Sequence, residues 1–361
     1  MNCRFLSRFA VITLAALITT LINASVYAQP VTLPTGNPTI LEYSIGDYGV
    51  TITGFSGDAQ NVIIPERING LSVVAIGEYA FFDGTLASII LPDSITYIGT
   101  YAFAFNQLAC IILPASLTYI GSFAFLSNRL TNIILPDSIM HIGSRAFSRN
   151  QLTSITLPNT IMRIENHAFA WNRLTSVILP DSITHIGNDA FDGNYLTRVI
   201  LPDSITHIGH NAFAGNQLTS ITLPASITHI GSNAFAGNQL TSITLPNSIT
   251  RIENGVFLGN QLTSIILPDS ITHIGSIAFS GNHLSSITFP DSVTFIGTSA
   301  FYQNPLTSIT IGANVTLMWN EATGNGVLGT DRSFDRAYVN AGRLAGTYTR
   351  ANAGSAIWTR Q

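Results

Sequence analysis

Prolines at one fixed interval constrain the fold of this chain more than any other feature of its sequence. Between residues 92 and 290, ten prolines each lie 22 residues after the one before: Pro92, Pro114, Pro136, Pro158, Pro180, Pro202, Pro224, Pro246, Pro268 and Pro290. A constant period of about 20–50 residues is the signature of solenoids, whose units stack on their neighbours to bury a continuous core. The proline period therefore predicts a repeat solenoid with 22-residue rungs.

Each unit reads approximately L-T-S-I-T-L-P-D-S-I-T-H-I-G-S-x-A-F-x-x-N-Q. The segment Leu152–Leu157 places its fourth and sixth residues on one face, which predicts a short strand that ends at Pro158, because proline has no N–H to donate. Such strands, stacked about 4.8 Å apart, form a parallel sheet. Ile161 and Ile164 are expected to return the chain along the opposite wall, and Ala168-Phe169 to form a short turn or helical piece.

Two columns of the repeat are predicted to fill the interior. One phenylalanine per unit supplies a large apolar side chain that can pack offset against its neighbours. One asparagine per unit can satisfy backbone groups of its own and the next rung, since an amide offers two donors and an acceptor. The phenylalanine column is Phe81, Phe103, Phe125, Phe147, Phe169, Phe191, Phe213, Phe235, Phe257, Phe279 and Phe301, and the asparagine column runs from Asn106 to Asn304.

A third column holds glycine in most units, for example Gly143, but glutamate in two units, Glu165 and Glu253. The exchange indicates that the position does not strictly require glycine. In both units the glutamate lies two residues after an arginine, Arg163 or Arg251. We expect a local surface ion pair in each, worth about 0–1 kcal/mol.

Units such as LTSITLPDSITHIGSNAFAGN resemble the BspA-like, or Treponema-type, leucine-rich repeats over residues 40–311. The stretch VIIPERINGLSVVAIGEYAF (62–81) looks like the first rung of that family, and residues 333–360 resemble a C-terminal module of its treponemal members. The resemblance implies a secreted or cell-surface solenoid that is associated with adhesion and interaction. It brings no catalytic residues to this chain.

Four parts are expected along the chain. Residues 1–28 have the charged start, apolar run and small-residue end of a secretory signal peptide, which predicts a secreted or cell-surface protein. Residues 29–61 contain two strand-like runs around Gly46-Asp47, which suits a β-hairpin cap. Residues 62–311 form a solenoid of about eleven rungs, and residues 312–361 a C-terminal cap. Signal cleavage would leave Cys110 as the single thiol, so no intramolecular disulfide is expected.

Composition and repetition exclude several functional classes. Only 9% of the 361 residues are charged and the net charge is −4, so no nucleic-acid partner is expected. All fifteen cationic side chains are arginine, which excludes lysine chemistry. Serine, histidine and aspartate recur as columns rather than as one unique triad. We therefore expect no catalytic residue, no cofactor and no transmembrane span after signal cleavage.

One histidine column leaves two further roles open. His141, His185, His207, His229 and His273 occupy one repeat position, and His185, His207 and His229 lie on consecutive rungs. Imidazoles about 5 Å apart could share a zinc ion or respond to mild acid. The position also accepts tyrosine, arginine and phenylalanine, which favours an ordinary half-packed column, and no cysteine or carboxylate cluster completes a metal site. His210 lies in a different, polar column and is interpreted as a neutral exchange with Ser232.

The outer face of the predicted strands is the main candidate for binding. It is a nearly uncharged surface of serine, threonine and isoleucine, and an exposed apolar row of this kind can mark an interaction surface. The alternative is that β-branched residues simply suit strands. The candidate strand face comprises Ser154, Thr156, Ser176, Ile178, Tyr195, Arg198, Ile200, Ser220, Thr222, Ser242 and Thr244, with Arg198 and Tyr195 as a local hot spot.

These features lead to three functional hypotheses. The first is an adhesin-like binding protein whose strand face recognises a protein or glycan on host matrix or on other cells. The second is a structural cell-envelope protein that associates with itself. An enzyme is the third and is not supported by any unique constellation. The arginine- and aromatic-rich residues 312–361 are a second candidate contact surface, or a lid over the last rung.

Overall fold

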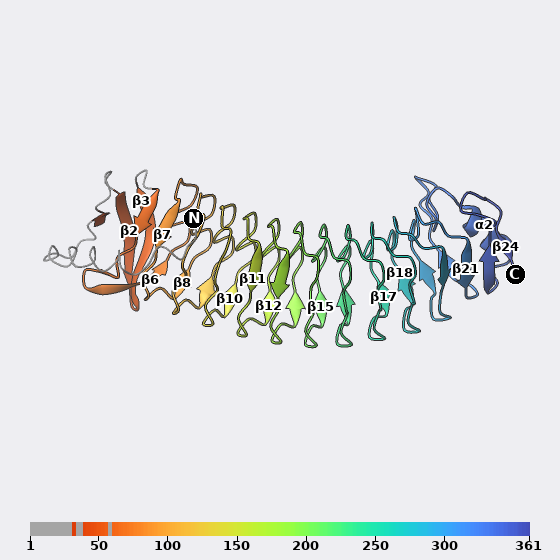
Figure 1. The fold of residues 1–361 in the computed structure, drawn as a ribbon, viewed down its shortest axis with the longest axis horizontal. Helices are drawn as coiled ribbons and strands as arrows, with labels where there is room; N and C mark the ends of the chain where they lie inside the picture. The colour runs from red at the N-terminus through yellow and green to blue at the C-terminus, as the bar shows by residue number, and fades with distance from the viewer. Residues whose placement is uncertain (1–30, 34–38, 57–59) are drawn as a thin grey trace. The chain divides into compact units, whose positions relative to one another are not determined.

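The computed structural model describes residues 31–33, 39–56 and 60–361. The expected signal peptide, residues 1–28, lies outside the described residues. The chain divides after Leu152 into two compact units, unit 1 (Met1–Leu152) and unit 2 (Thr153–Gln361). Each unit is built from successive 22-residue rungs (Figure 1), so the predicted fold class, a leucine-rich-repeat type of β-solenoid, is confirmed.

Unit 1 begins with an antiparallel hairpin that leads into the rungs. Its strands are β1 (Val31–Leu33), β2 (Thr39–Gly46), β3 (Gly49–Ser56), β4 (Asn61–Ile63), β5 (Arg67–Ile68), β6 (Leu71–Ile76), β7 (Ser88–Ile90), β8 (Tyr97–Ile98), β9 (Tyr119–Ile120) and β10 (His141–Ile142). β2 and β3 pair antiparallel around the turn between Gly46 and Gly49, where the sequence predicted a hairpin. β3 then pairs parallel with β6, so the hairpin supplies the strand that precedes β6, β8, β9 and β10 in one sheet.

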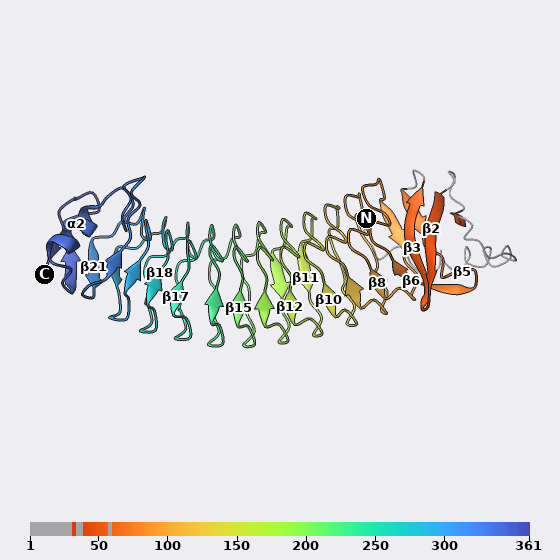
Figure 2. The same cartoon turned by 180° about the vertical axis from the view of Figure 1, so that it is seen from behind.

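Unit 2 contains two four-stranded parallel sheets on one wall, whereas the strands on the other wall pair between fewer successive rungs. Its elements are β11 (Ser154–Thr156), β12 (Arg163–Ile164), β13 (Ser176–Ile178), β14 (His185–Ile186), β15 (His207–Ile208), β16 (His229–Ile230), β17 (Arg251–Ile252), β18 (His273–Ile274), β19 (Ser286–Thr288), β20 (Phe295–Ile296), β21 (Ser308–Ile311), β22 (Thr316–Leu317), α2 (Ser333–Asn340), β23 (Gly346–Thr349) and β24 (Thr359–Arg360). Two four-stranded sheets, β12-β14-β15-β16 and β17-β18-β20-β22, form what we call the return wall. Figures 1 and 2 show β12, β15, β17 and β18 on this wall of unit 2.

The regular pairing lies on the wall opposite to the one that the sequence favoured. On the wall of the L-x-x-I-x-L segments, the described rungs of unit 2 pair in parallel only at β11–β13, at β19–β21 and at an isolated bridge between Thr244 and Ile266. β23 and β24 extend the second of these pairs into a four-stranded sheet. The alternation itself is as predicted, since Ile155 and Leu157 are buried and Ser154 and Thr156 exposed. The sequence pattern thus identified the inward residues but not which wall has the continuous hydrogen bonds.

The turn that contains the phenylalanine is not helical, because the backbone is left-handed at one fixed position of each rung. Asp189, Asn211 and Asn233 have φ between 52° and 58°, although none is glycine. Their amides donate to the next rung, as in the hydrogen bond of 2.9 Å from Asn211 N to Ser232 O. Because these bonds run between rungs instead of four residues along the chain, no helix forms there.

The interior columns pack as the sequence predicts. Phenylalanine rings of neighbouring rungs stack with centroids 5.2–5.3 Å apart from Phe81 to Phe147 in unit 1 and 5.3–5.9 Å apart from Phe169 to Phe301 in unit 2. Within the same layer, Asn216 is buried and accepts a hydrogen bond of 3.0 Å from Leu196 N. Its Nδ2 donates to Phe191 O and Phe213 O at 2.9 and 3.1 Å. The asparagine column is therefore an internal ladder.

Glycine is favoured in the Gly143 column because the backbone of the preceding rung lies too close for a Cβ, and not because the position has a positive φ. A Cβ on Gly231 would lie 2.5 Å from His210 N, a distance that real Cβ atoms essentially never show. Where Glu253 replaces glycine, β16 and β17 are not paired, and a new sheet begins at β17. The other four-stranded sheet of the return wall likewise begins at the strand that precedes Glu165. Of the two expected ion pairs, the one between Arg251 and Glu253 is present, with 3.6 Å between Nε and Oε1, whereas Arg163 and Glu165, both described, form none.

Residues after Ile311 continue the layers of the last rung in unit 2. β22 pairs parallel with β20 on the return wall. Ser299 N and Phe301 N donate to Gly326 O and Val327 O, as earlier rungs donate to their successors. β23 pairs antiparallel with β21, and β24 pairs antiparallel with β23. This segment therefore supplies backbone partners to three sides of the last rung.

Candidate interaction surfaces

All eleven residues of the candidate strand face are exposed in unit 2. The structure pairs Ser154 with Ser176 and Thr156 with Ile178 across β11 and β13. Ile178 and Ile200 have 63% and 67% of their surface exposed, which is unusual for isoleucine. The face is therefore an accessible surface of small hydroxyl groups interrupted by large apolar side chains.

The strand face extends beyond the residues that the sequence singled out. Ile266 belongs to the same outward column as Ile178 and Ile200 and is 85% exposed. Its identity as an isoleucine in that column was visible in the repeat. Arg198 is exposed and takes part in no ion pair within the described residues, so its charge faces solvent.

The turn of unit 1 bears an aromatic cluster that sequence reasoning did not single out. We call it the aromatic ridge, and it comprises Tyr79, Phe82, Tyr101, Phe105 and Phe123. Tyr79, Tyr101 and Phe123 stack with centroids 5.0 and 4.4 Å apart. Phe82 packs edge-on against Tyr101 and Phe105. The available signal was a run of aromatic residues at turn positions that vary in type in later units and include glycine and asparagine there.

Four residues of the aromatic ridge have a left-handed backbone conformation, which is strained for aromatic residues. Tyr79, Tyr101, Phe105 and Phe123 have φ between 55° and 60°. At the position of Phe105, five successive units of unit 2 have glycine, from Gly193 to Gly281. A bulky residue in this conformation costs about 1–2 kcal/mol, and the contacts between the rings offset part of that cost. The aromatic ridge is therefore a further candidate contact surface, besides the strand face and residues 312–361.

The histidines of the return wall in unit 2 are stacked rather than convergent. The rings of His185 and His207 are 4.6 Å apart with 8° between their planes, and those of His207 and His229 are 5.8 Å apart with 38° between them. Nearly parallel rings direct their nitrogen lone pairs side by side, which does not suit one shared tetrahedral zinc ion. No group of three metal-ligating side chains is present within the described ranges.

His210 has a structural role that the sequence interpretation missed. Its Nδ1 accepts a hydrogen bond of 2.9 Å from Ser232 N. In the neighbouring units, Asn188 and Asn254 accept in the same way through Oδ1, from His210 N and Ser276 N. The imidazole nitrogen thus replaces an amide oxygen as the acceptor for the next rung.

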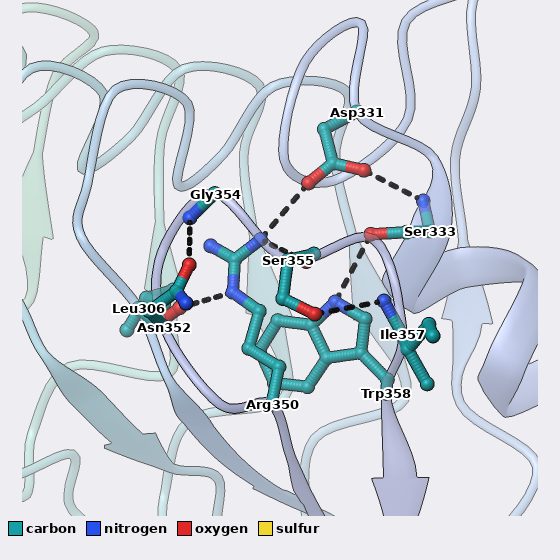
Figure 3. Close-up of polar contacts among 9 residues, drawn as sticks. All are labelled: Leu306, Asp331, Ser333, Arg350, Asn352, Gly354, Ser355, Ile357 and Trp358. Atoms are coloured by element: carbon teal, nitrogen blue, oxygen red, sulfur yellow. Dashed lines mark hydrogen bonds and ion pairs between the residues drawn. The ribbon is translucent and has the colours of Figure 1, made fainter.

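The arginines and aromatic residues near the C-terminus are largely engaged within unit 2. Figure 3 shows Arg350 held between Leu306 O, Asp331 and Ser355 O, with Nε donating to Leu306 O at 2.6 Å. The Arg350 side chain is buried except for 4% of its surface and lies 4.7 Å from the ring centre of Trp358. These contacts favour a lid over the last rung as the role of this segment.

Two carboxyl groups in unit 2 are held in poorly solvated sites. Burial raises the pKa of Asp335 to about 6, against the hydrogen bond from Val327 N, which lowers it. Burial also raises the pKa of Asp192 to about 6, and the nearby Asp189 adds to the rise. Neither carboxyl group has a nucleophile and a base arranged around it within the described residues, so we assign both side chains a structural role.

The stacked 22-residue rungs, their buried asparagine ladder and their phenylalanine stack define a leucine-rich-repeat protein. The family model described as the BspA type leucine rich repeat region matches residues 56–173, 162–282 and 251–323. Since these matches cover most of the chain, the protein belongs to the BspA-type leucine-rich-repeat family.

Solved structures of two bacterial proteins show the same fold. A leucine-rich repeat protein from Bacteroides ovatus is 22% identical, with a TM-score of 0.56, over 76% of this chain and 88% of that one. A leucine rich cell surface protein from Faecalibacterium prausnitzii is 24% identical, with a TM-score of 0.50, over 83% of this chain and 94% of that one. No curated protein matches the chain. Within the described residues, no helix has the length and apolar character to cross a membrane.

Proposed function

We propose that the protein is a secreted or cell-surface binding protein, adhesin-like, that recognises a protein or glycan on host matrix or on other cells. The observation that supports this most is the exposed strand face of unit 2, where Ile178 and Ile200 stand out from serine and threonine. Exposed apolar patches on solenoids are characteristic interaction surfaces. The Faecalibacterium prausnitzii protein with this fold is a cell surface protein, which agrees with the proposed location.

In this proposal, binding is multivalent and non-covalent, and no residue acts as a catalyst. Serine and threonine hydroxyls both donate and accept hydrogen bonds, which suits the hydroxyl groups of a glycan as well as a peptide backbone. Isoleucine side chains add apolar contact, and Arg198 adds one exposed charge. Tyr195 supplies an aromatic side chain beside it, as interface hot spots often do.

The test is binding of purified residues 29–361 to extracellular matrix proteins, glycans and intact cells. The variant Ile178→Glu/Arg198→Glu places two new charges on the strand face, and we expect it to lose a saturable partner. The matched control, Thr228→Glu, places one charge at an exposed position of the opposite wall and should bind normally. Equal binding by both variants would contradict the strand face as the site.

Self-association is the outcome that would replace this proposal. Sedimentation velocity over a hundredfold range of concentration distinguishes a monomer that binds foreign ligands from a self-associating envelope protein. A second variant, Tyr101→Ser/Phe105→Gly, removes part of the aromatic ridge. Loss of binding in that variant alone would move the site from the strand face to the aromatic ridge.

A further inference from the structure

One four-stranded sheet of unit 2 presents a row of cationic or protonatable side chains. We call it the acid stripe, and it comprises Arg163, His185, His207 and His229. These residues are paired in register across β12, β14, β15 and β16. In each strand the first residue faces outward and the following isoleucine is buried. The sheet therefore fixes one such side chain per rung in a straight row.

Threonines beside the histidines fix which nitrogen is free. Thr206 Oγ1 donates to Thr184 O at 3.2 Å and lies 2.8 Å from Nδ1 of His207. We assign the tautomer in which Nδ1 carries the proton, so that the hydroxyl oxygen accepts from Nδ1 while the hydroxyl proton points to the carbonyl. Thr184 makes the same two contacts, to Met162 O at 3.2 Å and to Nδ1 of His185 at 2.8 Å.

This arrangement leaves Nε2 as the ring nitrogen of His185 and His207 that faces an external partner. Protonation at Nε2 keeps the hydrogen bond at Nδ1, so the rings gain charge without losing their orientation. Neither Nε2 makes a hydrogen bond to any part of the chain that the structure describes. Both nitrogens are thus available to an external acceptor once they carry a proton.

The charges around the row oppose protonation in the free protein. Burial lowers the pKa of His185, and the positive charges of Arg163 and His207 lower it further. Burial also lowers the pKa of His229, with His207 and His210 adding to the effect and Glu253 opposing it. Glu253 is itself paired with Arg251. An anion bound along the row would relieve this repulsion, so binding and proton uptake are linked.

We propose that the acid stripe is a binding site for a linear anionic polysaccharide, and that mild acid activates it. Parallel strands place one cation per rung, about 4.8 Å apart. An extended polyuronate carries one carboxylate per ring along its length, and the carboxylates on its near side can reach several cations of the row at once. A linear polymer with one carboxylate per ring matches a linear row better than a compact anion does. The site lies on the return wall and does not depend on the strand face.

The direct test is binding of polygalacturonate to the purified protein at pH 5.0 and pH 7.5 in low salt. We expect binding to be tighter at pH 5.0 by about tenfold or more, and to weaken as salt is added. Fully methyl-esterified polygalacturonate has no carboxylates and should not bind. Titration calorimetry in two buffers of different ionisation enthalpy should show net proton uptake by the protein.

Two variants locate the site. His207→Gln interrupts the middle of the acid stripe and should remove most of the difference between the two pH values. His273→Gln is the matched control, because it changes the same repeat position in the sheet of β17, β18, β20 and β22, where Arg251 and Phe295 flank it. Arg163→Gln should weaken binding at both pH values.

Several results would overturn the proposal. Equal affinity at the two pH values would refute activation by acid, and equal losses in His207→Gln and His273→Gln would refute the location. Equally tight binding of a mixed-sequence single-stranded oligonucleotide at pH 5.0 would show a general polyanion surface instead of a polysaccharide site. Loss of binding in Ile178→Glu/Arg198→Glu, with His207→Gln unaffected, would assign the polymer to the strand face.

Discussion

Each rung depends on one buried asparagine, and its contribution can be measured by substitution. Asn216→Ala would leave Leu196 N without its acceptor and the carbonyls of Phe191 and Phe213 without Nδ2. Each unsatisfied buried group costs about 1–3 kcal/mol, and three groups lose a partner, so we expect the free energy of unfolding to fall by about 3 kcal/mol or more. Urea denaturation followed by circular dichroism measures the change.

The adjacent glutamine provides the control for this substitution. Gln217 is exposed, and Gln217→Ala should change the free energy of unfolding by less than about 0.5 kcal/mol. A loss in Asn216→Ala no larger than in Gln217→Ala would mean that the ladder contributes little. The sequence could predict this ladder, because an amide repeated at one position beside a phenylalanine column suits an internal role.

Asp335 gives a residue-scale prediction on pH. Its pKa in the folded protein is about 6, above the usual 3.8, so the folded state binds the proton more tightly than the unfolded state does. Its contribution to stability is complete below about pH 4 and is lost as pH rises through 6. Asp335→Asn should therefore raise the free energy of unfolding at pH 7.5, by up to about 3 kcal/mol.

The pH dependence distinguishes this effect from ordinary repacking. The advantage of Asp335→Asn over the unmodified protein should vanish at pH 4, where both side chains are neutral. The histidines His185 and His229 act with the opposite sign, since their lowered pKa values remove stability as pH falls. Comparing the two proteins at each pH cancels the histidine contribution, and a difference that is constant with pH would contradict the assignment.

Residue-scale features were only partly predictable from the sequence. Exposure of the strand-face residues could be predicted, because successive side chains of a single strand point alternately inward and outward. The role of His210 could not be inferred, because it depends on Ser232 N, an atom one rung away whose direction the sequence does not specify. The aromatic ridge was likewise hidden, because its stacking depends on the left-handed turn.

At the scale of elements, the glutamates of the glycine column decide where sheets end. Neighbouring rungs bring backbone within 2.5 Å of a Cβ at Gly231, so a side chain at that position forces rungs apart. Glu253→Gly should therefore let the amide at position 253 donate to Ile230 O and join β16 to β17. Hydrogen exchange followed by mass spectrometry should show stronger protection of residues 250–254.

Alanine at the same position separates the two explanations of this break. Glu253→Ala removes the carboxylate and the ion pair with Arg251 but keeps the Cβ. We expect protection at residues 250–254 to stay as in the unmodified protein. If alanine restored protection as well as glycine, the ion pair and not the Cβ would be the cause of the break.

Strand pairing between rungs could be predicted only in part from the sequence. The period predicted the solenoid and its inward residues, because both depend on contacts within one unit. It did not predict that the return wall pairs more regularly, since pairing depends on how closely successive backbones approach. Glu165 and Glu253 looked like tolerated exchanges in a column, whereas each lies where a sheet begins.

At the scale of the whole molecule, stability should depend on the last rung more than on any internal one. In solenoids each unit contacts only its neighbours, so removing one internal unit preserves the type of every remaining interface. A chain without residues 205–226 should therefore fold and unfold cooperatively. A chain that ends at Ile311 would lose β23, leave the edge of β21 unpaired and expose Phe301.

Light scattering and hydrogen exchange compare these two deletions. We expect the chain that ends at Ile311 to aggregate and to lose protection over residues 286–311, while the internal deletion stays dispersed. Unpaired strand edges are templates for further pairing, which is the physical cause. If both chains were equally soluble and protected, residues 312–361 would not act as a cap.

Adjacent rungs of unit 2 are nearly copies, since residues 205–224 and 227–246 differ only at His210 and Ser232. Where the codons also match, the gene contains long tandem segments that can mispair during replication. A slip by one unit keeps the reading frame and replaces every hydrogen bond between rungs with an equivalent one. The extent of the exposed faces is then inherited as a copy number, which can lengthen or shorten between lineages without any change in the residues of a rung.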